Sequence, residues 1–394
     1  MRIEQRESSA ARPSGRRHYP FVDVLRGVAI LWVFLFHSQG EVLGWDAFPD
    51  HALFRPLHGI QDLIFFPLRI GNLGVAMFFA ISGFCIHLSH QGAKSKSWMI
   101  FYLRRLFRLY PAYLFTLFVF VFIWPWSFFS WQSPTKVHEL LLHLLALHNF
   151  DPTTKYAINP SLWSIASEIQ LYMAYPFLLW LCRLFSWSRV LLALLLVELC
   201  LATLGGVNMR SNGVSFLIES PLAYWFSWSF GAYIAQGLLT NSPAVWISRI
   251  PLIPVFIFTL IISLVKPLAI YDFTVVALLT SLLIQRAVYG DFRASLMNSR
   301  LPRSVANALI RLGIVSYSLY LIHQPFLMII TRYIHGTHLY GGSPLSLFAL
   351  HALSLIPLFI VAHFLCRCIE KPGIRMGKLV ESSLLRSRFV DFLS

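Results

Sequence analysis

The chain has 394 residues, of which 57% are hydrophobic and only 12% are charged, and its formal net charge is +15 at pH 7. Soluble globular domains carry about 25% charged residues, so this composition excludes an ordinary soluble protein and favours a polytopic membrane protein. The basic residues are dispersed between apolar runs, which argues against a nucleic-acid-binding protein and fits a topology signal on a lipid bilayer.

Ten apolar runs follow one another along the chain, each long enough to cross a bilayer as about 20 helical residues. We predict an all-α, polytopic integral-membrane bundle of about ten transmembrane helices, at 21–42, 72–90, 109–129, 162–183, 189–206, 217–238, 250–265, 269–286, 312–333 and 345–367. A shorter run, 137–148, is interrupted by ionisable residues and predicts an interfacial or re-entrant helix.

Most of the 32 Lys and Arg residues fall on one side of the predicted spans. By the positive-inside rule this places both termini in the cytoplasm, with an even number of spans. We predict a disordered basic tail at 1–20, one membrane domain at 21–375 and a short cytoplasmic tail at 376–394. The five cysteines fall within spans or at cytoplasmic ends, so we expect no disulfide framework and no metal site.

Two ionisable residues, Arg26 and His37, lie inside the first apolar run. Charged side chains in a membrane segment are costly and by default indicate a functional site. Eleven residues make about three helical turns, so both side chains fall on one helix face, about 16 Å apart along the axis. We therefore predict a polar face with a guanidinium toward the inner end of the span and an imidazole toward the outer end.

An arginine cluster, Arg104, Arg105 and Arg108, precedes the third predicted span at its cytoplasmic end. Arg105 and Arg108 are three residues apart and point to one side of a helix. Paired guanidinium groups suit a phosphate-bearing ligand through bidentate hydrogen bonds. An anchor on anionic lipids has the same pattern, so spacing alone leaves both interpretations open.

Ser164 and Glu168 lie one helical turn apart near the outer end of the fourth predicted span. Glu168 is expected at a bilayer depth similar to that of His37. A histidine and a carboxylate at matched depth can form a general acid–base site, but a structural ion pair or a protonated core carboxyl explains Glu168 equally well. His323, in the ninth predicted span, is likewise either a packing residue or a functional one.

Taken in order, these motifs resemble the acyltransferase 3 family of integral-membrane acyltransferases, over residues 20 to 375. The family's opening motif is a basic residue, ten others and then His, as in Arg26 to His37. The other segments that are similar to family motifs are Phe78–Phe84 with Ser82, Arg105 to Arg108 followed by Pro111 and Tyr113, Ser161–Glu168 followed by Gln170 and Tyr172, Ser316–Pro325, and Ile369–Pro372. The departures, Ala80-Ile81 and Ala166-Ser167, remove no reactive group.

The resemblance implies transfer of an acyl group, most often acetyl, from cytoplasmic acyl-coenzyme A to hydroxyls of saccharide or glycolipid acceptors such as O-antigen or exopolysaccharide. It implies a multi-pass protein of the bacterial inner (cytoplasmic) membrane, in which acyl-coenzyme A is a co-substrate and no cofactor is bound permanently. Some members carry an additional esterase-like domain, and we expect a single-domain enzyme here.

The resemblance also implies roles for individual residues. His37 is expected to be catalytic, either as the base for the acceptor or as a transient acyl carrier, with Glu168 orienting it and Arg26 stabilising negative charge. Arg105, Arg108, Arg104 and Tyr113 are expected to contact coenzyme A. The supporting or substrate-binding residues are expected to be Asp23, Ser164, Gln170, Tyr172, His323 and Ser82.

A transporter or flippase of a lipid-linked or acylated saccharide is the alternative, because buried His, Arg and Glu also suit proton-coupled transport. The absence of an evident internal repeat argues against it. The sequence does not specify the acceptor, the acyl chain or the oligomeric state.

Overall fold

The computed structural model describes residues 19–43, 68, 70–93, 95–123, 129–208, 215–218, 220–242, 249–265, 267–289, 303–337 and 344–393. Every regular element in these ranges is helical, which confirms the predicted all-α fold. The predicted N-terminal tail, 1–20, falls almost entirely outside the described residues.

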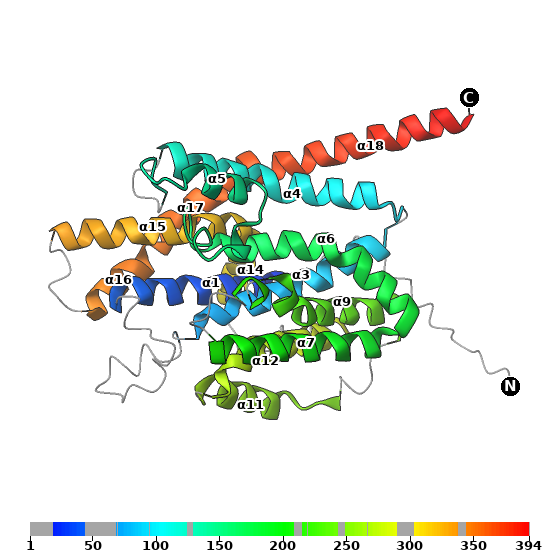
Figure 1. Ribbon diagram of the computed structural model, residues 1–394, viewed down its shortest axis with the longest axis horizontal. Coiled ribbons are helices and arrows are strands. Elements are labelled where there is room, and N and C mark those ends of the chain that lie inside the picture. Colours follow the sequence, from blue (N-terminus) through cyan, green and yellow to red (C-terminus); the bar gives the residue numbers. More distant parts are fainter. Residues whose placement is uncertain are drawn as a thin grey trace.

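Long helices lie side by side along the long axis of the molecule (Figure 1). The α-helices are α1 (Pro20–Leu43), α3 (Gly74–Gln91), α4 (Trp98–Phe118), α5 (Lys136–Leu144), α6 (Leu162–Phe185), α7 (Trp187–Asn208), α8 (Ser215–Ile218), α9 (Trp225–Leu239), α11 (Leu252–Leu264), α12 (Asp272–Tyr289), α14 (Arg303–Ile314), α15 (Ser316–Thr337), α16 (Pro344–Leu353), α17 (Leu355–Leu365) and α18 (Lys371–Leu393). Short 3-10 or π segments are η4 (Gly71–Leu73), η5 (Val119–Ile123), η6 (His148–Phe150), η7 (Pro221–Tyr224), η8 (Ala269–Tyr271) and η9 (Cys366–Glu370).

Seven helical segments of the described chain are long and apolar enough to cross a membrane, or eight if the pair α14–α15, bent by 81°, counts as one span. The protein is therefore a multi-pass membrane bundle, and the described residues contain fewer full-length spans than the ten expected. Two expected spans correspond to α9 and α11, which have 15 and 13 residues and fall short of the roughly 20 needed to cross the hydrocarbon core.

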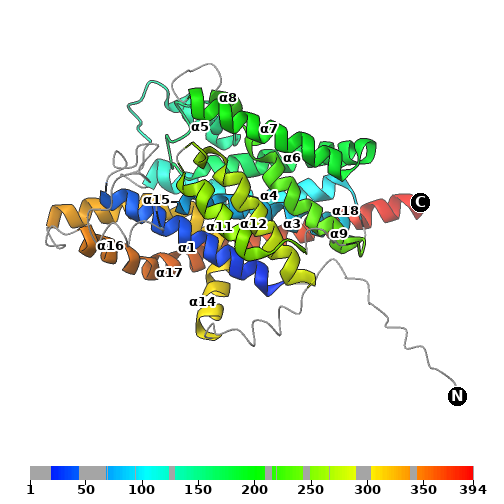
Figure 2. The ribbon, with the colours of Figure 1, turned by 90° about the horizontal axis from the view of Figure 1, so that it is seen from below.

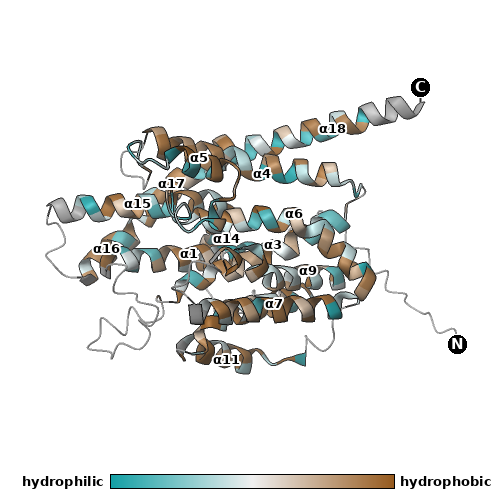
Figure 3. Ribbon diagram, viewed as in Figure 1, coloured by the Kyte–Doolittle hydropathy of each residue, from teal (hydrophilic) through white to brown (hydrophobic). Residues whose placement is uncertain are grey.

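Large apolar side chains on the outer surface suit a lipid environment, as the brown ribbons of α7 and α11 illustrate (Figure 3). On α11, Ile253 is 74% exposed and Phe256 54%. In water such a surface would be an aggregation site, whereas lipid tails solvate it.

The centre of the bundle is held by close helix crossings at glycines. A Cβ atom at Gly83 on α3 would lie 1.8 Å from the Trp228 carbonyl oxygen of α9, and one at Gly231 would lie 2.0 Å from the Ala80 carbonyl oxygen. Small residues of this kind let membrane helices approach backbone to backbone. Trp228 itself is fully buried beside this crossing.

Two elements differ from the sequence prediction. Helix α4 begins at Trp98 rather than near residue 109, so the arginine cluster lies within the helix and not ahead of it. Residues 303–311 belong to the connection expected between the eighth and ninth spans, but they form most of the amphipathic helix α14, which packs against α1 at the edge of the bundle (Figure 2). Its alternation of polar and apolar residues escapes a search for uniformly apolar runs.

After α17, the chain continues through η9 into α18 without a long break. Helix α18 packs along α4, where a Cβ atom at Gly373 would lie 2.7 Å from the Phe107 carbonyl oxygen. The segment expected to be a short tail, 376–394, is thus largely helical and lies in part against the bundle.

Candidate active site

A cavity of about 930 Å³ opens between α1, α3, α4, α6, α15 and α18. Its walls carry five basic and three acidic side chains, so the formal charge of the lining is positive. The ionisable Lys, Arg and Glu residues of the lining are Arg26, Arg104, Arg105, Arg108, Lys378, Glu168, Glu370 and Glu381. A partly enclosed, positively charged cavity concentrates anionic ligands.

The arginine cluster forms one wall of this cavity. Arg104 is paired with Glu381 of α18, through a bidentate contact in which Nε donates at 2.8 Å. Arg105 donates one N–H to Ser89 Oγ at 3.1 Å, but its buried Nε–H has no hydrogen-bond partner among the described residues. A buried cationic donor without a partner is costly, so the Nε–H of Arg105 favours binding of an anionic group to which it can donate.

Arg108 lies deeper along the same helix face and is within electrostatic range of Glu370 and Glu168. Glu370 accepts a hydrogen bond from Ser318 Oγ at 2.9 Å. The Arg105–Arg108 pair therefore extends from the end of the cavity that contains Glu381 toward the end that contains Glu168.

Glu168 lies at the other end of the cavity, and hydrogen bonds to one of its carboxylate oxygens hold its side chain in place. Ser82 Oγ donates to Oε1 at 2.6 Å, and the Tyr172 hydroxyl donates to the same oxygen at 2.5 Å. Trp228 Nε1 in turn donates to Ser82 Oγ at 3.3 Å. Because both hydrogen bonds end on Oε1, the side chain is oriented while Oε2 is left for a ligand in the cavity.

Two hydroxyls form a pair at this end. Ser164 Oγ and the Tyr320 hydroxyl lie 2.7 Å apart, and both residues line the cavity. The Tyr320 ring also packs edge-on against Phe78, with centroids 5.9 Å apart. Ser164 and Tyr320 can exchange donor and acceptor roles, which suits binding of a carbonyl oxygen.

Arg26 lies on the cavity wall contributed by α1. Its guanidinium is 3.8 Å from Asp23 Oδ1 and donates to Cys85 Sγ at 3.6 Å. Asp23 is buried beside it and is not among the residues that line the cavity. Asp23 thus offsets part of the cost of placing Arg26 in the bundle.

His37 lies on α1 beyond the cavity lining, next to His323 of α15. The two rings pack edge-on with centroids 4.8 Å apart, and His323 in turn lies 5.2 Å from the Tyr320 ring. A chain of ring contacts through His323 and Tyr320 therefore connects His37 to the cavity. The prediction that Glu168 orients His37 differs from this arrangement, since the hydrogen bonds of Glu168 go to Ser82 and Tyr172.

Two further predicted residues stabilise the segment that contains α5 and η6, which we name the outer segment after its predicted side of the membrane. The buried Tyr113 hydroxyl donates to the His143 carbonyl oxygen at 2.7 Å, and Gln170 Nε2 donates to the Ala146 carbonyl oxygen at 2.7 Å. Neither residue lines the cavity. Their hydrogen bonds join this outer segment to α4 and α6.

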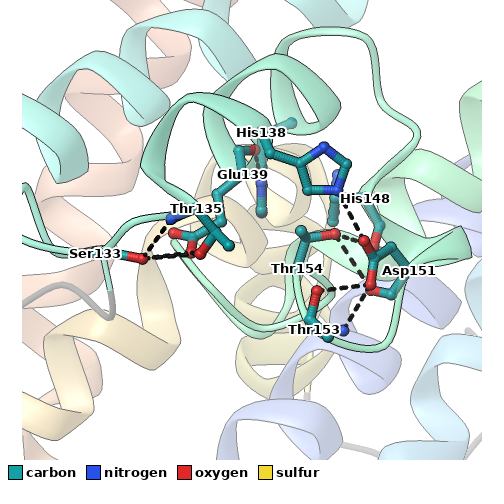
Figure 4. Close-up of polar contacts among 9 residues, drawn as sticks. Ser133, Thr135, His138, Glu139, His148, Asp151, Thr153 and Thr154 are labelled. Carbon is teal, nitrogen blue, oxygen red and sulfur yellow. Dashed lines mark hydrogen bonds and ion pairs between the residues drawn. The ribbon is translucent and has the colours of Figure 1, made fainter.

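The outer segment has its own polar network (Figure 4). Thr135 Oγ1 donates to Glu139 Oε1 at 2.5 Å, and His138 Nε2 lies 2.8 Å from Asp151 Oδ2. Thr153 donates twice to the other oxygen of Asp151. Beneath this network the rings of His143 and His148 stack at 3.9 Å.

The sequence prediction missed part of the cavity wall. Lys378 and Glu381 belong to the segment expected to be a tail, and Glu370 had been noted only as part of a motif. Lys378 and Glu381 lie three residues apart on α18, which places them on one side of that helix, and Glu370 lies at the end of η9.

Comparison with known proteins identifies the family. A sequence profile described as an acyltransferase domain matches residues 19–366. The chain belongs to the acyltransferase 3 family. This confirms the resemblance seen in the motifs, and it makes the chain a member of a family of membrane acyltransferases with an acyl donor and an acceptor.

Two relatives are similar to this chain at low sequence identity. O-acetyltransferase OatA of Staphylococcus aureus (strain NCTC 8325 / PS 47) is 24% identical over 395 residues, which cover 92% of this chain and 58% of OatA. Regulator of hypoxia-inducible factor 1 of Caenorhabditis elegans is 30% identical over 175 residues, covering 40% of this chain and 33% of the nematode protein. The chain thus spans between a third and three fifths of the length of these two relatives, and no solved structure matches it.

Proposed function

We propose that this acyltransferase transfers an acyl group, most simply acetyl, from cytoplasmic acyl-coenzyme A to a hydroxyl of a saccharide acceptor, with His37 as the catalytic residue. O-antigen and exopolysaccharide are the acceptor classes that we favour, at the inner membrane of a bacterium. The observation that carries the proposal is the half-buried Arg105–Arg108 wall of the cavity, in which the buried Nε–H of Arg105 has no hydrogen-bond partner among the described residues.

A polyphosphate donor head suits this wall, because guanidinium groups bind phosphate oxygens through paired hydrogen bonds. The cavity of about 930 Å³ has the size range of ligand sites for large molecules. Its far end supplies hydroxyls from Ser164 and Tyr320 and one open oxygen of Glu168. We propose that the thioester carbonyl lies beside the two hydroxyls, which donate to its oxygen as negative charge develops.

In the proposed reaction, His37 removes the proton of the acceptor hydroxyl on the outer side as the oxygen attacks the thioester carbon. The carbon–oxygen bond forms, the carbon–sulfur bond breaks, and the sulfur leaves with the electron pair. The proton held by His37 returns to the thiolate, so the overall reaction consumes no oxidant or reductant. Arg26, lower on α1, stabilises the negative charge of the leaving donor.

The transporter alternative predicts no covalent product. Membership in an acyltransferase family favours chemistry over transport. Incubation of the purified protein with labelled acyl-coenzyme A and saccharide acceptors separates the two, because only a transferase makes an acylated acceptor.

Donor binding tests the cavity assignment directly. We expect Arg105→Ala combined with Arg108→Ala to weaken acyl-coenzyme A binding by about 100-fold, since each charge-assisted hydrogen bond contributes roughly 1.5–3 kcal/mol. Binding is measured with labelled donor on detergent-purified protein. Arg183→Ala is the control, because Arg183 is an exposed arginine at the end of α6 and does not line the cavity. Donor affinity equal to wild type in the double variant would return these arginines to a lipid-anchoring role.

A further inference from the structure

One face of α3 lines the cavity over most of the length of this helix. Ser89 Oγ accepts a hydrogen bond from Arg105, and Ser82 Oγ, seven residues earlier, donates to Glu168. Val75, seven residues earlier again, lines the same cavity. Seven residues make about two helical turns and about 10 Å, so the lining continues about as far past Ser82 as Ser82 lies from Ser89.

Past Ser82 the lining becomes chiefly apolar. The apolar side chains that line this end of the cavity are Val75, Phe78 and Phe79 of α3 and Ile165 of α6, one turn before Glu168. These side chains neither donate nor accept hydrogen bonds, so this apolar end suits a hydrocarbon group better than a phosphate or an amide. The Arg105–Arg108 wall has the opposite character and suits the charged head of the donor.

The hydroxyl pair proposed to bind the thioester carbonyl borders the apolar end. The Tyr320 hydroxyl lies 2.7 Å from Ser164 Oγ, and the Tyr320 ring packs edge-on against Phe78. A thioester carbonyl bound by this pair lies at the level of Phe78, with its acyl side toward Phe79 and Val75. These two residues are one helical turn apart, about 6 Å along the axis, which is room for a short acyl group.

Phe79 forms a supported wall of the apolar end. Its ring centroid lies 5.3 Å from that of Tyr224 in η7 and 5.7 Å from that of Phe273 in α12, and the latter two centroids are 4.9 Å apart. Tyr224 and Phe273 do not line the cavity, so they support the Phe79 ring from behind. A ring packed in this way cannot move aside without losing contacts with both neighbours.

We propose that the apolar end is the pocket for the acyl chain of the donor, and that Phe79 is the residue that limits this chain to a few carbons. Acetyl leaves the Phe79 ring in place, whereas a longer chain has to displace it. This assignment rests on the proposed function, which supplies the donor and the position of its thioester.

Competition between donors of different chain length tests the pocket without turnover. Unlabelled acetyl-, butyryl- and hexanoyl-coenzyme A displace labelled acetyl-coenzyme A from detergent-purified protein, and each inhibition constant is measured. We expect wild type to bind acetyl- at least about 10-fold more tightly than hexanoyl-coenzyme A, and Phe79→Ala to lower this ratio by at least about 10-fold. The size follows because one methylene in a hydrophobic pocket changes discrimination by about 10- to 200-fold.

Ile86→Ala is the matched control. Ile86 is also an apolar residue of α3 that lines the cavity, and like Phe79 it is 2% exposed. It lies seven residues from Phe79 on the side of the Arg105–Arg108 wall, so its truncation enlarges the cavity away from the acyl chain. The ratio of the two inhibition constants should therefore stay at the wild-type value.

Phe79→Leu replaces the Ala variant if that variant does not fold, and it should shift the ratio in the same direction because it leaves a smaller void. Wild type that binds hexanoyl- as tightly as acetyl-coenzyme A, an unchanged ratio in the folded Phe79 variant, or an equal shift in Ile86→Ala would overturn the pocket. Transfer from labelled acetyl-coenzyme A to O-antigen polysaccharide is measured alongside. Wild-type protein that binds the donor but forms no product would refute the proposed function, and the competition would still decide where the acyl chain lies.

Discussion

At the scale of single residues, the carboxylate of Glu168 combines restraint with access. Two donors from different helices, Ser82 and Tyr172, fix one oxygen, and the other oxygen remains available to the cavity. The restraint is useful because a group that acts on a ligand contributes most when its orientation is set in advance.

Removing one of these donors tests that view. We expect Tyr172→Phe to lower acyl transfer by about 10-fold, because it removes one of the two hydrogen bonds that orient Glu168, and a hydrogen bond contributes roughly 0.5–1.5 kcal/mol. Donor affinity should change by less than about twofold, since the arginine wall is intact. Tyr102→Phe, which removes a surface hydroxyl bonded to the Met173 carbonyl oxygen, is the matched control. Wild-type turnover in Tyr172→Phe would show that the orientation of Glu168 is unimportant.

Sequence reasoning predicted arrangements within one helix, but not the contacts between helices. Helical spacing correctly indicated that Arg105 and Arg108 share a face, because that depends only on one helix. The contact between His37 and His323 was not predictable, because the two residues are 286 positions apart and the sequence does not specify how their helices are rotated. Matched bilayer depth predicts that Glu168 and His37 lie at one level of the membrane, but depth does not specify which helices face one another.

At the scale of elements, the outer segment α5–η6 joins the ends of α4 and α6 and contains a buried imidazole pair. Burial lowers the pKa of His143 from 6.5 to about 4, although the bond to the Glu139 carbonyl oxygen and the Glu139 charge oppose the shift. Burial also lowers the pKa of His148 well below 6.5, and the neighbouring His143 adds to this. For Asp151, partial burial is outweighed by hydrogen bonds from His138 and Thr153, which lower its pKa below 3.8.

This predicts a segment that opens in mild acid. When the segment opens, its imidazoles take up protons near pH 6.5, whereas in the closed state His143 takes one only near pH 4. Stability is therefore fully present above about pH 6.5 and falls as the pH drops toward 4. Asp151 does not contribute in this window, because its carboxylate stays ionised down to below pH 3.8.

Hydrogen exchange of residues 136–150, expressed as protection factors at pH 7.5 and 5.5, measures this opening. Protection should be lower at pH 5.5 in wild type. The double variant His143→Phe with His148→Phe should lose the difference, since it keeps stacked rings without titration. A pH dependence of the same size in that variant would assign the effect to other groups.

Elements with a uniform apolar character were predicted well, and those with mixed character were not. Helix α14, which packs against α1, was missed because polar residues are interspersed among its apolar ones. Most of helix α18 was expected to be a tail, because its charged residues lower the mean hydropathy of the segment. Its place in the bundle depends on the pairing of Glu381 with Arg104, which joins distant parts of the chain. Tertiary contacts of this kind stabilise helices that propensity and hydropathy leave undecided.

At the scale of the whole molecule, the distribution of basic residues predicts the sidedness of the membrane domain. Helix α1 and helix α18 run in opposite directions along the long axis (Figures 1 and 2). If both termini are cytoplasmic, the Glu381 end of the cavity faces the cytoplasm and α5 faces the opposite side.

Cysteine labelling in intact cells checks this arrangement. Leu145, which is 61% exposed just after α5, should be labelled by a membrane-impermeant maleimide as Leu145→Cys. The exposed Arg386 of α18 should be labelled as Arg386→Cys only after the membrane is permeabilised. The reverse pattern would invert the topology and place the arginine wall on the wrong side for a cytoplasmic donor.

The most direct test of the whole account is acyl transfer by purified protein carrying His37→Ala. With labelled acyl-coenzyme A and an accepted saccharide, wild type should form an acylated product. The variant should bind the donor normally and form product at least about 1,000-fold more slowly, because the base for the acceptor hydroxyl is missing. Product formation by the variant at the wild-type rate would contradict the assignment of His37 as the catalytic residue.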